Sequence, residues 1–163
     1  WSQNVDDAAN DPIEGYDNLM YTLHFYAGTH KEWLREKGDY AMSKGLALFV
    51  TECGGMNADG QGPIDVESTE AWIEWMDDND ISYIFWSVSD KAETCSMLYP
   101  SASSEGLWGD AVVSPWGKTV KKYTKYHRTQ EERYDAKRSQ RRSTVLILLN
   151  LIFLVVIYKR GDK

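Results

Sequence analysis

Leu46-Ala-Leu-Phe-Val-Thr-Glu-Cys-Gly-Gly55 is the stretch that decides the fold of this 163-residue chain. The run is apolar along most of its length and is flanked by Gly45 on one side and by Gly54 and Gly55 on the other. This pattern predicts a strand that is buried on both faces. The run ends at Glu52, and a carboxylate is costly to place at the end of an apolar strand unless something uses it. Because parallel α/β folds build their sites at the C-terminal ends of strands, Glu52 is a candidate site residue. The alternative is a structural Glu that caps a helix or pairs with a lysine.

Outward from this strand, strands and helices alternate along the chain. After an acidic loop at the N-terminus, we expect strands over residues 19–27, 46–55 and 81–88. The first helix is expected to run from a capping box at Thr29 and Glu32 to Gly45, and the second over residues 66–79. A last helix is expected to begin at Ser114-Pro115. This alternation predicts a parallel sheet, either doubly wound or part of a (β/α)8 barrel. Three strands cannot close a barrel, so we interpret the sequence as a fragment whose N-terminal part is missing.

Charge and aromatic content narrow the class of partner. The net charge is −7, and residues 1–120 carry 21 acidic and six basic side chains. So acidic a surface argues against a nucleic-acid partner, because phosphates would be repelled. The seven Trp and ten Tyr favour either an aromatic-rich core or a cleft in which sugar rings stack. No Cys or His spacing indicates a metal site, and we expect no cofactor.

The last part of the chain differs from the rest. Residues 127–142 are highly charged and predict a basic helical linker. Residues 143–158 then run without a charge up to Lys159 and Arg160. This run falls just short of the about 17 apolar residues of the shortest membrane-spanning helices, but the flanking lysines and arginines can snorkel to the membrane surface. We therefore expect a transmembrane helix over residues 143–160. An interfacial helix or an error in the gene model are the alternatives.

Polar and aromatic side chains fall at the ends of the three predicted strands. His24 and Tyr26 are two residues apart, so they lie on the same face of their strand. If the strands are parallel neighbours, these two residues share one rim with Glu52 and Trp86. Taken singly, each has a structural alternative, such as a core histidine or a packed aromatic ring. Together they suit the binding of a sugar.

Four spaced motifs resemble the cellulases of glycoside hydrolase family 5, the endo-β-1,4-glucanases. In chain order the motifs are Trp1-Ser-Gln-Asn-Val-Asp, Tyr21-Thr-Leu-His-Phe-Tyr-Ala, Phe49-Val-Thr-Glu-Cys-Gly and Trp86-Ser-Val-Ser-Asp-Lys-Ala-Glu. The resemblance covers residues 1–125 and implies strands six to eight of a (β/α)8 TIM barrel, with the end of strand five before them. It also implies retaining hydrolysis of β-1,4-glucan without a cofactor, outside the cell or at its surface.

The resemblance implies a role for each matching residue. Glu52 would be the nucleophile, with His24 and Tyr26 beside it as catalytic residues. The residues implied to bind substrate are Tyr26, Trp86, Trp1, Ala58 and Asp59 in the loop after the nucleophile, and Lys91, Ala92 and Glu93 in the loop after the third strand. A retaining glycosidase also needs a second carboxyl group about 5 Å from the nucleophile, which acts as acid and base.

The sequence departs from the family's pattern in two places. The family's acid/base Glu lies in an Asn-Glu-Pro motif, which is absent here and is expected upstream of Trp1. We therefore expect residues 1–126 alone to be inactive. Cys53 stands where the family often has Trp. Two alternatives stay open: another family 5 glycosidase, acting on mannan or mixed-linkage glucan, and a non-catalytic membrane protein that binds glycan.

The two cysteines follow two of the predicted strands. Cys53 comes directly after Glu52, and Cys95 lies in the loop that leaves the next strand. If the strands are neighbours, both lie on the same rim, and the extracellular setting that the resemblance implies permits oxidation. We predict a disulfide between Cys53 and Cys95. The alternative is two unrelated buried thiols.

Overall fold

The computed structural model describes residues 1–125, of which Trp1–Val120 form one compact unit. Its elements are α1 (Val5–Asn10), β1 (Tyr21–Tyr26), α2 (Glu32–Ser43), β2 (Leu48–Gly54), α3 (Val66–Asp78) and β3 (Ser82–Phe85), and residues 115–125 are also helical. The predicted linker at 127–142 and apolar segment at 143–160 lie outside the described residues. Within the described residues, no helix is long and apolar enough to cross a membrane.

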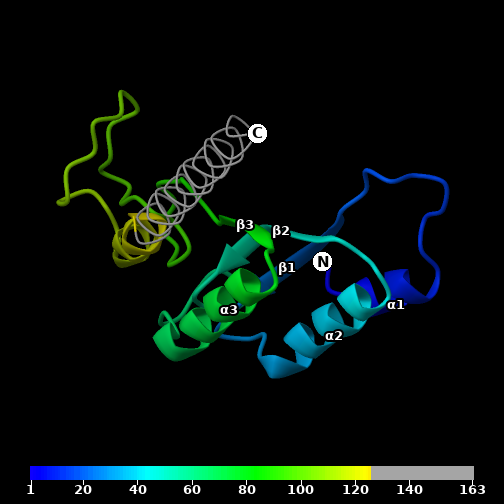
Figure 1. Ribbon diagram of the computed structural model, residues 1–163. Helices are drawn as coiled ribbons and strands as arrows, with labels where there is room; N and C mark the ends of the chain where they lie inside the picture. Colours follow the sequence, from blue (N-terminus) through cyan, green and yellow to red (C-terminus); the bar gives the residue numbers. More distant parts are fainter. Residues whose placement is uncertain (126–163) are drawn as a thin grey trace, which may run out of the picture. The chain divides into compact units, whose positions relative to one another are not determined.

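The three strands form one parallel sheet in the order β1-β2-β3 (Figure 1). Each pair of neighbours is joined by a helix, α2 between β1 and β2 and α3 between β2 and β3. The prediction of a parallel α/β sheet is therefore confirmed. In this arrangement the C-terminal ends of all three strands lie along one edge, which is where the candidate site residues were expected.

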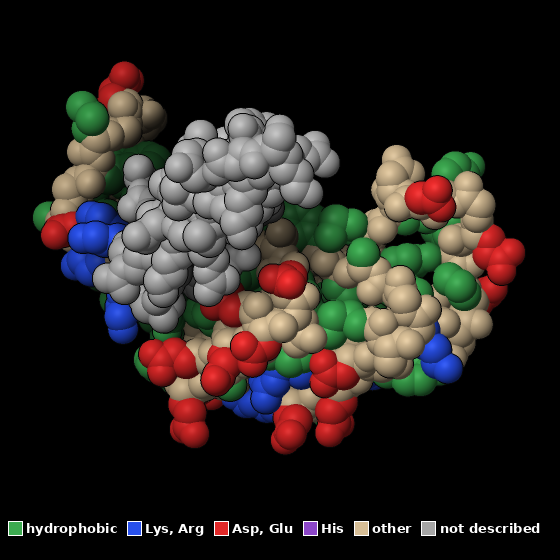
Figure 2. Space-filling model, viewed as in Figure 1, with side chains coloured by type: hydrophobic (Ala, Val, Ile, Leu, Met, Phe, Trp, Pro, Cys, Tyr) green, Lys and Arg blue, Asp and Glu red, His purple; other side chains and the backbone are tan. Residues whose placement is uncertain are grey.

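The core fills the space between the sheet and the two connecting helices. Phe25 of β1 stacks on Trp72 of α3, with ring centroids 3.9 Å apart and ring planes 6° apart. Leu23 and Val50, from β1 and β2, are fully buried, as is Leu34 of α2. The outer surface of α2 and α3 is rich in acidic side chains (Figure 2), and Glu32, Glu36, Glu67, Glu70 and Glu74 are all exposed there. The helical face is thus solvated on its outside and apolar beneath.

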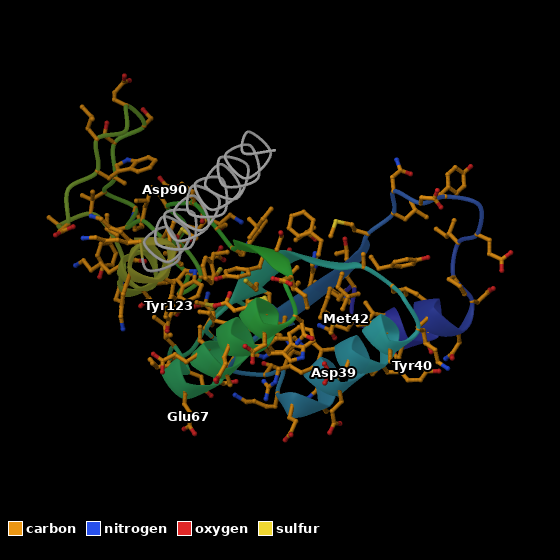
Figure 3. The ribbon with its side chains drawn as sticks, viewed as in Figure 1. Asp39, Tyr40, Met42, Glu67, Asp90 and Tyr123 are labelled. Atoms are coloured by element: carbon orange, nitrogen blue, oxygen red, sulfur yellow. The ribbon has the colours of Figure 1, made fainter. Side chains whose placement is uncertain are left out.

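The helices α2 and α3 approach each other closely at Gly38. A Cβ atom at this position would come within 2.7 Å of the Trp75 ring of α3, so only glycine fits without a shift. The Trp75 indole nitrogen donates a hydrogen bond to Asp39 Oδ1 at 2.7 Å; Asp39 is labelled on α2 in Figure 3. The close contact fixes the two helices against the sheet whose strands they connect.

Three local predictions have different outcomes. The capping box was wrong: α2 begins at Glu32 without a side-chain cap, because the Thr29 hydroxyl instead accepts a hydrogen bond from the Ala58 N–H at 2.9 Å. The N-terminal acidic loop was also wrong in part, since residues 5–10 form α1, which buries one apolar side along Val5 and Ala9. The last helix does open as predicted, since its Gly117 N–H donates to the Ser114 hydroxyl.

Candidate active site

Strand β2 contains one residue more than its neighbours just before Glu52. Thr22 and His24 of β1 are two residues apart, yet they pair with Phe49 and Glu52, which are three apart, and the register toward β3 shifts at the same place. An inserted residue reverses the alternation of side chains. Without it, Glu52 would share the face of Val50, which lies in the core. With it, Glu52 lies on the face of its register partner His24.

The end of β2 brings Glu52 together with two side chains of β1. The Tyr26 hydroxyl donates a hydrogen bond to Glu52 Oε1 at 2.7 Å. On the other side, His24 Nδ1 lies 3.7 Å from Glu52 Oε2, and the His24 and Glu52 side chains are each 26% accessible to solvent. The three residues expected to be catalytic thus form one cluster, which is open to a ligand at the C-terminal edge of the sheet.

Tyr26 remains a hydrogen-bond donor at all ordinary pH values. Burial, and then its hydrogen bond to the Glu52 carboxylate, raises the pKa of the Tyr26 phenol far above its ordinary value. A bond from a neutral hydroxyl to a carboxylate is charge-assisted and therefore stronger than a neutral one. It holds one oxygen of Glu52 in place and leaves the other toward His24.

His30 is a buried residue that the sequence did not single out, and it holds the end of β1. The Nδ1 atom of the His30 ring accepts a hydrogen bond from the Tyr26 backbone N–H at 2.8 Å. The backbone N–H of His30 donates to the Tyr26 carbonyl. Because Nδ1 is an acceptor, the ring proton lies on Nε2. The Gln3 side-chain nitrogen 2.9 Å away is also a donor, so this contact is a hydrogen bond only when the Gln3 amide turns its oxygen toward Nε2. His30 is therefore neutral and fixes the backbone that carries the Tyr26 hydroxyl.

We expect His30 to make stability depend on pH. Burial lowers the pKa of His30 below its ordinary value, so the folded state takes up a proton less readily than the unfolded one. The resulting stability is fully present above the unfolded-state pKa of about 6.5 and is lost as the pH falls through the lower folded-state pKa. Melting temperatures measured between pH 8 and pH 5 should show the loss.

The matched variant is His30→Asn, whose side-chain oxygen can accept the Tyr26 N–H bond but cannot gain a proton. Its melting temperature should fall less between pH 8 and pH 5 than that of the unsubstituted protein. An equal fall in both proteins would show that the other titratable groups, and not His30, cause the loss of stability.

Two loops beyond the strand ends carry most of the residues expected to bind substrate. Ala58 and Asp59 lie in the loop after β2, where the Thr29 hydroxyl holds the Ala58 N–H and Asp59 Oδ1 accepts from Gln61 N–H at 2.9 Å. In the loop after β3, Lys91 Nζ lies 3.9 Å from Glu93 Oε1, and the neighbouring Ala92 is exposed.

These two loops are joined to each other and to the carboxylate cluster. The Cys95 N–H donates to the Gly60 carbonyl at 3.1 Å, and Cys95 packs in a buried cluster with Tyr26, Met56 and Trp116. Both loops therefore rest on the residue that hydrogen-bonds Glu52.

The tryptophans expected to contact sugar are both exposed. Trp86, which follows β3, is anchored through its backbone: its N–H donates to the Cys53 carbonyl at 2.8 Å, and its carbonyl accepts from the Trp116 indole at 2.6 Å. Its side chain keeps 43% of its surface accessible, so a face is available for stacking. Trp1 is fully exposed and lines a cavity at β1 with Tyr21 and Thr22.

The predicted disulfide between Cys53 and Cys95 was wrong, because both cysteines are free and buried. The Cys53 thiol donates to the Ile84 carbonyl of β3 at 3.4 Å, whereas Cys95 lies under the loop after β2, near Gly60. Burial raises the pKa of both thiols, that of Cys95 to about 11, where the hydrogen bond to Glu93 adds to the effect. Both are therefore protonated at neutral pH.

The chemistry available at this edge of the sheet is that of a positioned carboxylate beside exposed aromatic and polar groups. Among residues 1–125, no group of three or more His, Cys, Asp and Glu side chains could hold a metal ion. Glu52 can act as a nucleophile or stabilise a developing positive charge, and the exposed face of Trp86 can stack on a sugar ring.

Known proteins resemble this chain in sequence and in fold. Residues 1–92 match the family described as cellulase (glycosyl hydrolase family 5). Endoglucanase Z of Dickeya dadantii is 52% identical over 119 residues, which make up 71% of this chain and 28% of the relative. A solved structure from Cytophaga hutchinsonii is 49% identical, with a TM-score of 0.71, over 74% of this chain and 39% of that chain.

A more distant structure shows the same fold with a ligand. The catalytic domain of Thermobifida fusca endoglucanase Cel5A, in a variant in complex with cellotetraose, is 25% identical with a TM-score of 0.65, over 72% of this chain and 38% of that chain. The chain spans 28% of the length of Endoglucanase Z and 27% of the endoglucanase of Clostridium saccharobutylicum. Its three parallel strands align with part of the barrel of these enzymes. From the family match over residues 1–92 and these relatives, the chain belongs to the cellulase family, glycosyl hydrolase family 5.

Proposed function

We propose that this chain is the C-terminal part of the catalytic barrel of an endo-β-1,4-glucanase, containing strands six to eight, and that the whole enzyme hydrolyses β-1,4-glucan with retention. The observation that carries the proposal is the Glu52 carboxylate, held by the Tyr26 hydroxyl at 2.7 Å and faced by His24 at the C-terminal edge of a parallel sheet. Barrel enzymes build their active sites at this edge.

In this mechanism Glu52 attacks the anomeric carbon and forms a covalent glycosyl-enzyme intermediate, which water then hydrolyses. The Tyr26 hydrogen bond keeps one carboxylate oxygen oriented, so that the other can approach the sugar. A second carboxyl group must protonate the leaving oxygen. We expect it outside this chain, which matches only 28% and 27% of the length of two endoglucanase relatives.

The substrate follows from the relatives and from the exposed groups near Glu52. Endoglucanases are the relatives at 52% and 45% identity, and the Thermobifida enzyme binds cellotetraose. In this chain, Trp86 offers a flat apolar face to a pyranose, and Lys91, Glu93 and Asp59 offer polar groups to its hydroxyls. Because polymeric β-1,4-glucan lies outside cells, we propose that the enzyme acts outside the cell or at its surface.

The stereochemistry of hydrolysis tests the proposed function. The intact protein that contains this chain is mixed with a cello-oligosaccharide, and proton NMR follows the anomer released in the first turnovers. We expect the β-anomer first, because two displacements at the anomeric carbon restore its configuration. Initial release of the α-anomer would contradict the retaining mechanism, and hydrolysis of mannan in place of glucan would contradict the substrate.

Replacing Tyr26 with Phe should lower kcat on cello-oligosaccharides about 10- to 100-fold, because the ring stays and only the hydrogen bond to Glu52 is lost. The charge-assisted bond is worth about 1.5–3 kcal/mol. The control is Tyr16→Phe, a change at an exposed position outside the cluster, which should leave kcat within about twofold. If Tyr26→Phe also stays within twofold, Tyr26 does not hold the reacting carboxylate.

A further inference from the structure

The imidazole of His24 has a partner at each of its two nitrogens. Nε2 lies 2.8 Å from the Thr51 hydroxyl oxygen, and Nδ1 lies 3.7 Å from Glu52 Oε2. Both partners come from adjacent residues of β2. The His24 side chain is three-quarters buried.

Adjacent residues of a regular strand could not reach the same ring, because their side chains point to opposite faces. The inserted residue in β2 removes this restriction. The register pairs His24 with Glu52 and leaves Thr51 as the residue without a partner on either neighbouring strand. The bulge therefore has two effects: it turns Glu52 out of the core, and it brings the Thr51 hydroxyl to the far nitrogen of His24.

The chemistry of the two contacts decides where the proton of a neutral His24 lies. A neutral imidazole has one N–H donor and one bare nitrogen. A bare Nδ1 would turn its lone pair toward the Glu52 carboxylate, which is unfavourable, whereas an Nδ1–H turns a positive edge toward it. The Thr51 hydroxyl can donate or accept, so it donates to Nε2 when the proton lies on Nδ1.

We propose that Thr51 is a positioning residue: its hydroxyl holds His24 with the Nδ1–H toward the carboxylate of Glu52. The proposal rests on the proposed function, because it assigns Thr51 a part in setting the electrostatics of the nucleophile. Thr51 does not touch the reacting atoms, and it acts only through the orientation of the His24 ring, whose proton the Glu52 carboxylate favours on Nδ1.

The test compares Thr51→Val with Thr51→Ser in the intact protein that contains this chain. Valine keeps the shape and branching of threonine and removes the hydroxyl, whereas serine keeps the hydroxyl. Nitrogen-15 NMR of the His24 ring reports which nitrogen is protonated, and kcat and KM are measured on a cello-oligosaccharide. Melting temperatures show that all three proteins are folded.

In Thr51→Val, Nε2 of His24 loses its hydrogen-bond donor, so the Nε2 shift should move toward that of an imidazole nitrogen without a hydrogen bond, while Nδ1 keeps its proton. The same variant should lose about tenfold in kcat, with KM within about twofold, because the contact acts on the transition state. Thr51→Ser should recover the Nε2 shift and most of the kcat. A role in folding alone would lower the melting temperature but leave the Nε2 shift and kcat unchanged.

The proposal is overturned if Thr51→Val keeps the nitrogen shifts of the unsubstituted protein, or if serine fails to recover them. Its failure differs from a failure of the proposed function. If the unsubstituted protein hydrolyses no glucan, the proposed function is wrong, and the nitrogen shifts still decide whether Thr51 holds the ring of His24.

Discussion

In the intact protein, Glu52→Gln is expected to lower kcat on β-1,4-glucan by about 10⁴-fold or more, since a lost nucleophile costs several orders of magnitude. An amide has nearly the shape of the carboxylate and can still accept the Tyr26 hydrogen bond, but it attacks an anomeric carbon far less readily. The affinity for cello-oligosaccharides, measured by calorimetry, should change by less than about fivefold, since the groups that bind sugar are unchanged.

The matched control is Glu67→Gln, which makes the same chemical change at an exposed site. Glu67 lies in the first turn of α3, on the side of the helix away from the sheet (Figure 3). This variant should keep kcat within about twofold. If Glu52→Gln also kept kcat within tenfold, Glu52 would not be the nucleophile.

Trp72→Ala is expected to lower the free energy of unfolding by about 3–5 kcal/mol, the usual cost of deleting a fully buried large aromatic ring. Trp72 is fully buried, its ring stacks on Phe25, and its indole nitrogen donates to the His30 carbonyl at 2.9 Å. The variant would therefore lose apolar contacts and leave a buried carbonyl without its donor. Urea unfolding of the intact protein measures the change.

Trp72→Phe separates these two contributions. The smaller ring keeps part of the stack on Phe25 but loses the hydrogen bond to His30, so we expect a loss of about 2 kcal/mol. The surface control is Leu107→Ala, because Leu107 is fully exposed and its truncation should change stability by less than about 0.5 kcal/mol. Equal effects of Trp72→Ala and Leu107→Ala would show that α3 is not packed through Trp72.

The sequence was sufficient for the three strands, for the helices between them and for the edge of the sheet that carries the site. The apolar run around Val50 and the aromatic run around Phe25 can be buried only as strands of a layered fold, and the helices between them require a parallel sheet. Since parallel strands end at one edge, the spacing alone also placed His24, Tyr26 and Glu52 near one another.

What the sequence could not provide depends on tertiary contacts. The bulge before Glu52 is a matter of register between strands, and no local pattern distinguishes Thr51 as its extra residue. Counting alternate residues along β2 would place Glu52 on the core face with Val50. The position of Cys53 at a strand end likewise fixed its Cα but not the direction of its thiol, which turns to β3 and away from Cys95.

The local pattern was also misleading at the start of α2. Thr29 and Glu32 have the spacing of a capping box, but the Thr29 hydroxyl bonds a loop 29 residues further along the chain. His30 looked like part of that same turn, and nothing in its neighbourhood indicates that its ring accepts the Tyr26 N–H. A contact between distant segments decided the first case, and a bond from the backbone four residues earlier to the His30 ring decided the second.

The central claim, that Glu52 is the nucleophile of a retaining glycosidase, is tested most directly by trapping the intermediate. The intact protein is treated with a 2-fluoro cello-oligosaccharide derivative that has an activated leaving group, so that the intermediate forms and hydrolyses slowly. Peptide mass spectrometry after acid quenching then locates the sugar. The account predicts one glycosyl unit on the peptide that contains Glu52 and none in the Glu52→Gln variant. A stable adduct on any other residue would contradict it, and so would retaining hydrolysis by Glu52→Gln at the rate of the unsubstituted protein.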